Sequence, residues 1–168
     1  MKRNIIRISF LVLLLYSIPA FAQEREKFAL YKPEENAKLA LDSVLSEAAK
    51  QGKNVFVQIG GNWCSWCARF HELATKDKQV DSAIEKNFIV YHLNYSKENK
   101  NPELLKQFEY PQRFGFPVFI ILDSKGRRLH TQNSSYLEEG KGYNKEKVIS
   151  FLNDWRPAAF EPEQYKNY

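Results

Sequence analysis

The sequence predicts an α/β fold in which helices cover both faces of a mixed central sheet. Short apolar runs that predict strands alternate with amphipathic helical patterns, in the order α-β-α-α-β-α-β-β-α. Strands joined through helices pair in parallel, and sheets of that kind are covered on both faces. The last two strands are joined by a tight turn at residues 123–126, which adds an antiparallel edge. The length of 168 residues suits one domain of common size.

The first 22 residues have the features of a secretory signal peptide. A basic N-terminal region with Lys2, Arg3 and Arg7 is followed by an apolar run over residues 8–18 and by the small residues Ala20 and Ala22. Signal peptidase requires small residues at these two places, so we expect cleavage after Ala22. About 11 apolar residues are fewer than the ~20 that cross a bilayer as a helix, which disfavours an uncleaved anchor. The expected product is exported, periplasmic or otherwise extracytoplasmic, without stable membrane insertion after cleavage.

The formal charge of +5 suggests an acidic partner, such as nucleic acid or a membrane surface. Three of the 25 basic residues and none of the 20 acidic ones lie in the signal peptide, so the mature chain carries +2. Export and this small charge argue against a nucleic-acid partner. The aromatic residues that could stack on bases fall at core positions of strands and helices: Phe56, Phe88, Phe119 and Phe151.

Residues 23–33 are polar and mixed, and we expect a loose lead-in there. The domain itself is expected over residues 34–156, followed by an irregular tail over residues 157–168. Proline and two glutamates at residues 33–35 are typical of a helix start, so the first helix is expected to open there. Its apolar face continues to Ala48.

The other elements follow from the same patterns in chain order. Gly52 ends the first helix, and residues 54–60 form a short, apolar strand that is expected to be buried. The rest are a helical pattern over 68–73, a second around 80–88, a strand over 88–94, a short helix over 102–108, a turn region over 111–117, a strand over 118–122, a return strand over 127–131, a polar loop over 132–143 and a last helix over 145–155.

Cys64 and Cys67 are the only cysteines, and they are spaced C-x-x-C where a buried strand gives way to a helix. Two cysteines exclude a disulfide-framework protein. At a helix N-terminus, free backbone N–H groups and the helix dipole stabilise a thiolate, the nucleophile of disulfide exchange. We expect Cys64 to be exposed at the helix tip and Cys67 to be more buried. Cys64 would attack a partner disulfide, and Cys67 would resolve the mixed disulfide.

Other interpretations of the same residues stay open. The cysteines and His71 fall at i, i+3 and i+7, so one helical face could present all three to a zinc ion. A structural zinc site requires four ligands, however. A c-type haem needs a histidine where Ala68 stands. A purely structural disulfide would close only a small ring and stabilise weakly. We therefore expect no metal and no organic cofactor, because the electrons reside in the cysteine pair.

Residues 63–67, after an apolar strand, resemble the active site of the thioredoxin superfamily. Residues 113–118 resemble the family's Gly-apolar-Pro segment, whose proline has a cis peptide bond and faces the dithiol. The resemblance covers residues 34–155 and implies a thioredoxin-like fold. The extra helical stretch near residues 80–88 and the signal peptide are more similar to exported bacterial thioredoxin-like proteins than to cytosolic thioredoxin.

The resemblance also implies roles for single residues. Cys64 matches the nucleophilic cysteine and Cys67 the resolving one, together forming the redox disulfide. Pro117 matches the cis-proline, which keeps metal off the thiols and offers backbone to a bound peptide. The residues expected to contact substrate around the dithiol are Trp63, Trp66, Phe116 and Pro117. We expect the side chains of Trp63, Trp66 and Phe116 to be exposed and to form an apolar lip for peptide or protein substrates.

Two positions depart from thioredoxin. Gln58 stands where thioredoxins often carry an acid that moves a proton to or from the buried cysteine, and a glutamine cannot do that. Ser65 and Trp66 replace a Gly-Pro pair that influences redox potential, so the reducing or oxidising direction stays open. We expect a thiol–disulfide oxidoreductase that acts on protein disulfides or thiols and is recycled by a redox partner. The alternative is a non-enzymatic thioredoxin-like module that binds peptides or proteins.

Overall fold

The structure is a computed structural model, and it describes residues 28–167. The expected signal peptide and its cleavage site, together with residues 23–27, lie outside the described residues. Within the described part, no helix combines the length and apolarity that a membrane span requires.

A four-stranded mixed sheet forms the centre of the molecule, with the strand order β2-β1-β3-β4. β1 and β2 are parallel, β3 is antiparallel to β1, and β4 is antiparallel to β3. The mixed sheet and its antiparallel edge are therefore confirmed. The strands are β1 (Asn54–Gly60), β2 (Phe88–Asn94), β3 (Val118–Leu122) and β4 (Arg128–Asn133).

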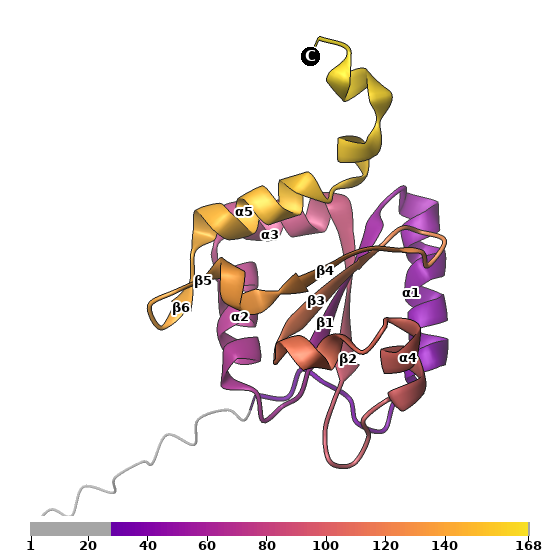
Figure 1. Ribbon diagram of the computed structural model, residues 1–168, viewed down its shortest axis with the longest axis vertical. Helices are drawn as coiled ribbons and strands as arrows, with labels where there is room; N and C mark the ends of the chain where they lie inside the picture. Colours follow the sequence, from indigo (N-terminus) through magenta and orange to yellow (C-terminus); the bar gives the residue numbers. More distant parts are fainter. Residues whose placement is uncertain (1–27, 168) are drawn as a thin grey trace, which may run out of the picture.

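Helices lie on both sides of this sheet (Figure 1). α1 (Ala37–Gln51) and α4 (Pro102–Gln107) cover one face. α2 (Ser65–Lys76), α3 (Lys78–Asn87) and α5 (Lys145–Asp154) cover the other. The predicted α/β fold and the order of its main elements are confirmed.

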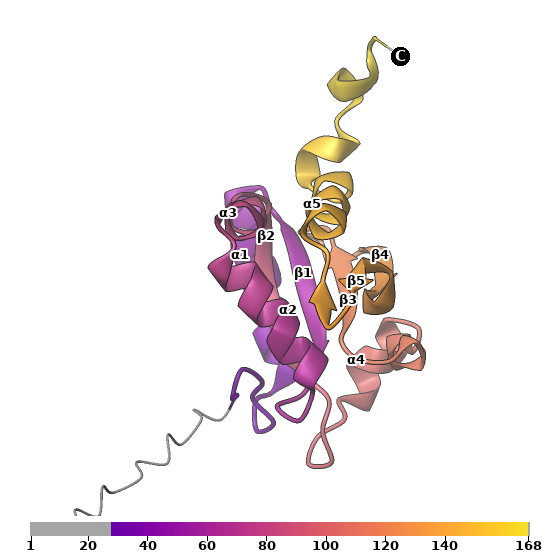
Figure 2. The ribbon, with the colours of Figure 1, turned by 90° about the vertical axis from the view of Figure 1, so that its left-hand side faces the viewer.

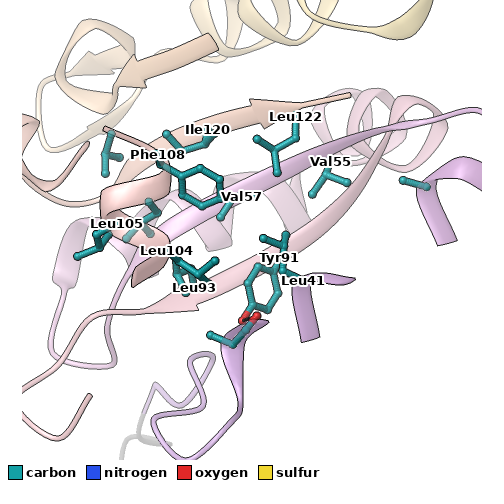
Figure 3. Packing of buried hydrophobic residues seen from close by; sticks show 14 residues of the cluster. Leu41, Val55, Val57, Tyr91, Leu93, Leu104, Leu105, Phe108, Ile120 and Leu122 are labelled. Carbon is teal, nitrogen blue, oxygen red and sulfur yellow. Dashed lines mark hydrogen bonds between the residues drawn. The ribbon is translucent and has the colours of Figure 1, made fainter. Parts of the chain in front are cut away.

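The layer between the sheet and helices α1 and α4 is a continuous hydrophobic core (Figure 3). β1 and β3 give alternate residues to it, because successive side chains of a strand point to opposite faces. Among its buried members are Leu41, Val57, Ile59, Tyr91, Leu93, Leu105, Phe108, Ile120 and Leu122.

The opposite layer combines aromatic rings with aliphatic side chains. The Phe56 ring of β1 stacks on the Phe70 ring of α2 with 5.7 Å between centroids, and both contact Phe119 of β3. This packing fixes α2 against β1 and so places the start of the helix at the end of the strand. The four phenylalanines predicted to be core are confirmed: Phe56, Phe88, Phe119 and Phe151 are all buried.

The expected opening of α1 at residues 33–35 is wrong. The helix begins at Ala37, because the side chain of Asn36 accepts a hydrogen bond of 3.2 Å from the Leu39 N–H and caps the first turn. Residues 33–35 form a turn instead, closed by the Glu35 N–H and the Lys32 carbonyl.

The polar loop expected over residues 132–143 is also wrong for most of its length. Leu137 is buried, and Tyr143 packs against the aromatic core. These anchors order a segment whose composition is typical of a loop. It contains the end of β4, a 3₁₀ helix at Ser134–Leu137, and a two-stranded sheet formed by β5 (Glu138–Glu139) and β6 (Gly142–Tyr143).

The tail follows α5, which ends at Asp154, one residue before the predicted end. It carries two short 3₁₀ helices, Pro157–Phe160 and Pro162–Tyr165. The tail leaves the body beyond the end of α5, away from the end of the sheet where α2 begins (Figure 2).

Candidate active site

Cys64 and Cys67 form a disulfide where β1 gives way to α2, and their Cα atoms are 5.2 Å apart. Cys64 is the N-cap of α2, and its sulfur accepts a hydrogen bond of 3.1 Å from the Cys67 backbone N–H. The positive end of the helix dipole and the Cys67 N–H therefore both point at the Cys64 sulfur. After reduction, this arrangement stabilises a thiolate at Cys64.

The expected exposure of Cys64 at the helix tip is wrong. Only 4% of Cys64 is exposed and none of Cys67, so both sulfurs lie in a small apolar cluster with Tyr31. Side chains from the segment before α1, from α2 and from the turn before β3 pack against this cluster: Phe28, Leu30, Trp66 and Phe116.

The peptide bond between Phe116 and Pro117 is cis, as the resemblance implies. It lies immediately before β3, whose first residue, Val118, pairs with Ile59 of β1. Since β1 leads into the cysteine loop, this pairing brings the cis peptide to the same end of the sheet as the disulfide. Phe116 packs directly against the cysteine cluster.

Trp63 forms an exposed aromatic edge beside the disulfide. Its indole N–H donates a hydrogen bond of 2.8 Å to the Tyr95 carbonyl, and 58% of the residue is exposed. Its ring meets the Phe116 ring edge-on at 5.4 Å, and Phe116 in turn contacts Tyr95 at 4.6 Å. Gly61 permits this placement, because a Cβ there would stand 2.3 Å from the indole nitrogen.

Trp66 and Phe116 are partly buried, so the expectation that both are exposed is wrong. Trp66 is sandwiched on α2: the Arg69 guanidinium lies 4.7 Å from its ring centroid, and the Tyr143 ring meets it edge-on at 5.6 Å. A cation over an indole face is a favourable contact. The β5–β6 hairpin thus contributes to the surroundings of the disulfide through Tyr143.

Beneath the disulfide lies a buried polar pair, Gln58 and Tyr31, each 2% exposed. The Gln58 Nε2 donates to the Tyr31 hydroxyl oxygen at 2.9 Å and, at 3.4 Å, to the Cys67 carbonyl. Burial raises the pKa of Tyr31 well above its usual value, although the hydrogen bond from Gln58 works in the opposite direction. Tyr31 therefore stays protonated across the physiological range.

Tyr31 belongs to the segment expected to be a loose lead-in, and for residues 28–31 that expectation is wrong. The Tyr31 N–H donates to Asn62 Oδ1 and the Asn62 Nδ2 donates to the Tyr31 carbonyl, both at 2.9 Å. The segment runs along the end of the molecule where α2 begins (Figure 1). The apolar pair Leu30 and Tyr31 in a polar stretch was the signal that sequence reasoning passed over.

His92 and His71 lie on the α2 side of the same region, with ring centroids 6.2 Å apart. Burial, together with His71, lowers the pKa of His92 to about 4. A cavity of about 210 Å³ beside them is lined by apolar side chains and by the polar residues Gln58, Thr75 and Asp81. In residues 28–167 no group of three or more histidine, cysteine and acidic side chains is arranged to hold a metal, and the two cysteine sulfurs are bonded to each other.

The chain matches the thioredoxin-like family over residues 36–124. It is 25% identical, over 97 residues, to the thiol:disulfide interchange protein DsbD of Actinobacillus pleuropneumoniae serotype 5b (strain L20). That match covers 57% of this chain but only 16% of the DsbD protein, so the chain corresponds to a small part of that relative.

Two solved structures share the fold. A disulphide isomerase from Xylella fastidiosa Temecula1 is 19% identical, with a TM-score of 0.66 over 75% of this chain and 95% of the other. The C-terminal domain of Neisseria meningitidis DsbD, in its reduced form, is 22% identical, with a TM-score of 0.52 over 71% of this chain and 96% of the other.

Proposed function

The chain belongs to the thioredoxin-like family, and we propose that it is an exported thiol–disulfide oxidoreductase that exchanges disulfides with proteins through Cys64 and Cys67. One observation carries this proposal: the two cysteines form a disulfide at the N-terminus of α2, where the helix stabilises the Cys64 thiolate. The similarity to a thiol:disulfide interchange protein supports the same chemistry.

All bonds that form and break in the proposed reaction join sulfur atoms of Cys64, Cys67 and the substrate. In the reducing direction, the Cys64 thiolate attacks a substrate disulfide, forms a mixed disulfide and releases one substrate thiolate. Cys67 then loses its proton and attacks the Cys64 sulfur, which releases the second substrate thiolate and forms the Cys64–Cys67 disulfide. Two electrons have passed to the substrate, and the departing thiolates take up protons. The oxidising direction is the same sequence reversed, and a redox partner restores the starting state.

The surface around the disulfide suits an extended, partly apolar segment of a protein substrate. Trp63 is exposed, and Phe116 and Tyr95 continue its aromatic surface along the end of the sheet. The backbone at the cis peptide before Pro117 borders this surface and would pair with a substrate main chain. Trp66 would contact the substrate at the α2 side, although its partly buried ring offers less area.

Export rests on the signal peptide at residues 1–22, which is expected to leave a mature chain with a thioredoxin-like domain over residues 34–156. Intact-mass measurement of the protein recovered from the producing cell tests this part. A chain that begins at Gln23 is the expected result, and an uncleaved N-terminus would contradict export of the mature form.

A second candidate is a binding module whose disulfide takes no part in exchange. The burial of both cysteines favours it, since an attacking sulfur needs access to its partner. Phe116 and Trp66 must therefore move aside during exchange if the chain is an oxidoreductase.

Reduction of insulin by dithiothreitol separates the two functions. The oxidoreductase accelerates it, and Cys64→Ser removes the acceleration because serine cannot form the mixed disulfide. Ser46→Ala, a change of an exposed residue on α1 outside the cysteine loop, is the matched control and keeps the activity. A parent protein no faster than Cys64→Ser would contradict the proposed function and favour the binding module.

A further inference from the structure

Cys67 poses a problem that the proposed function leaves open. Its sulfur is completely buried, yet it must become a thiolate to resolve the mixed disulfide, and it leaves as a thiolate when the Cys64–Cys67 disulfide is opened. An uncompensated anion is costly in such a place. The strand position beneath it carries Gln58, whose amide can neither give nor take up a proton at neutral pH.

The Tyr31 hydroxyl lies beside this sulfur. A Cβ built on Gly60 would stand 2.4 Å from the Cys67 sulfur and 2.8 Å from the Tyr31 oxygen, so both atoms face the same point of the β1 backbone. The absence of a side chain at Gly60 is what lets the hydroxyl and the sulfur share this space. Tyr31, Cys64 and Cys67 form one buried cluster.

Gln58 orients that hydroxyl. Its Nε2 donates to the Tyr31 oxygen, so the phenol proton has to point away from the amide. Among residues 28–167 no nitrogen or oxygen accepts this proton in a hydrogen bond. The proton is therefore free for the neighbouring sulfur.

The backbone of Tyr31 is also held in place. Two reciprocal hydrogen bonds with Asn62 fix it to the loop that carries Cys64. The rings of Phe28 and His92 meet the Tyr31 ring edge-on at 6.3 and 5.7 Å. A group held this firmly keeps its position while the sulfurs change their bonding.

We propose that Tyr31, held by Gln58, donates a hydrogen bond to the Cys67 sulfur whenever that sulfur is anionic. This inference rests on the proposed function and names the group that stabilises the buried Cys67 anion in it. In the reducing direction the hydrogen bond stabilises the Cys67 thiolate before it attacks Cys64. In the oxidising direction it stabilises the same thiolate as it leaves. Gln58 acts through Tyr31 and is a positioning residue.

Tyr31 is a donor in this scheme and never a base. Burial keeps its phenol protonated, so it does not remove the proton from Cys67. That proton leaves with the substrate thiolate that departs. The hydrogen bond lowers the cost of the anion without adding a second charge to a buried site.

The pKa of the Cys67 thiol tests this role directly, because a purely structural role of Tyr31 would not move it. The full chain carrying Cys64→Ala leaves Cys67 as the single thiol, and the ultraviolet absorbance of its thiolate is followed against pH. Adding Tyr31→Phe removes one hydroxyl and keeps the ring. A hydrogen bond to a charged group has the strength to shift a pKa by about one to two units, so we expect the Cys67 pKa to rise by that amount.

Tyr91→Phe is the matched control. Tyr91 is also a buried tyrosine, but its hydroxyl bonds Glu35 and the Ala37 carbonyl, where β2 meets α1. We expect this variant to leave the Cys67 pKa unchanged. An unchanged pKa in Tyr31→Phe, or an equal rise in Tyr91→Phe, would overturn the inference.

Other charged and titratable groups around Tyr31, Gln58 and the cysteines remain the same in both variants, so a shift confined to Tyr31→Phe belongs to the hydroxyl. They come from α2, α3, β2 and the β5–β6 hairpin: Arg69, His71, Asp81, His92, Glu138 and Tyr143. Insulin reduction is measured separately on chains with both cysteines. Its failure would overturn the proposed function, whereas the Cys67 pKa alone decides the role of Tyr31.

Discussion

The indole N–H of Trp63 donates a hydrogen bond to the Tyr95 backbone carbonyl at 2.8 Å, which ties the residue before the first cysteine to the loop after β2. The bond holds a large exposed ring against Phe116, next to the cis peptide. Exposed aromatic surface of this kind is a common feature of protein-binding sites. The aromatic surface of Trp63 and Phe116 therefore places a candidate substrate-binding surface beside the Cys64–Cys67 disulfide.

Replacing Trp63 by alanine should weaken binding of protein substrates more than it slows chemistry. We expect the KM for a disulfide-containing protein to rise about tenfold, because burial of an aromatic side chain is worth a few kcal/mol at most and only part of the ring meets the substrate. The reaction with a small dithiol should change little. Steady-state kinetics with both substrates measure the difference.

Phe160→Ala is the control for this prediction. Phe160 is also an exposed aromatic residue, but it ends the 3₁₀ helix Pro157–Phe160 of the C-terminal tail. The tail leaves the body away from the start of α2, where the disulfide lies (Figure 2). It should leave both KM values unchanged. Equal losses for the protein and the small dithiol in Trp63→Ala would show that the ring serves the chemistry rather than substrate binding.

Replacing Cys67 by alanine should trap the substrate. Without the resolving thiol, the mixed disulfide at Cys64 persists until an external reductant opens it. We expect a covalent adduct with a disulfide-containing protein on non-reducing gels, and its disappearance after dithiothreitol. The matched variant Cys64→Ala should give no adduct, since the remaining Cys67 is completely buried. Equal trapping by both variants would contradict the assigned order of attack.

The partly buried His92 should make the protein less stable in mild acid. Its pKa is lowered to about 4 in the folded state, whereas an unfolded histidine titrates near 6.5. Between these values the unfolded chain binds more protons, so the free energy of unfolding falls as the pH decreases from about 6.5 to about 4. Urea unfolding across this range should show a loss of about 1–3 kcal/mol from this residue.

His92→Gln should flatten this part of the pH profile. His130→Gln removes a histidine from β4, at the other edge of the sheet, and should preserve the slope. A slope that survives in His92→Gln would show that other groups cause the acid sensitivity.

Loss of the Asn62 side chain should release the segment around Tyr31. Asn62→Ala removes both hydrogen bonds to the Tyr31 backbone, and we expect the free energy of unfolding to fall by about 1–3 kcal/mol. Asn62→Asp keeps the acceptor for the Tyr31 N–H and loses the donor, so its loss should be smaller. Urea unfolding measures both variants. An unchanged stability in Asn62→Ala would contradict the close docking of this segment.

Much of this architecture was predictable because it depends on local patterns. The sheet strands are short apolar runs, and Asn54–Gly60 has the predicted bounds. The cysteine pair and the cis-proline segment are short motifs that can be recognised from their own residues. The chain order therefore placed the cysteines after β1 and the cis-proline before β3.

The polar pair beneath the disulfide was not predictable in the same way. Tyr31 and Gln58 are 27 residues apart, and nothing in either neighbourhood reveals that they meet. Tyr143 is likewise hidden in a polar stretch, and the burial of Cys64 depends on side chains from several distant elements. Local periodicity reports which face of one element is apolar, but it carries no information on which distant residues complete a site.

The reduction potential of the Cys64–Cys67 pair is the decisive measurement of whether this disulfide takes part in exchange. The protein is equilibrated in buffers of defined dithiol–disulfide ratio, and the free thiols are counted by mass after alkylation. A redox-active pair predicts a reversible two-electron transition between about −270 mV, typical of thioredoxin, and about −120 mV, typical of a strong oxidant. A disulfide that stays closed below about −300 mV, as structural disulfides do, would contradict disulfide exchange through Cys64 and Cys67.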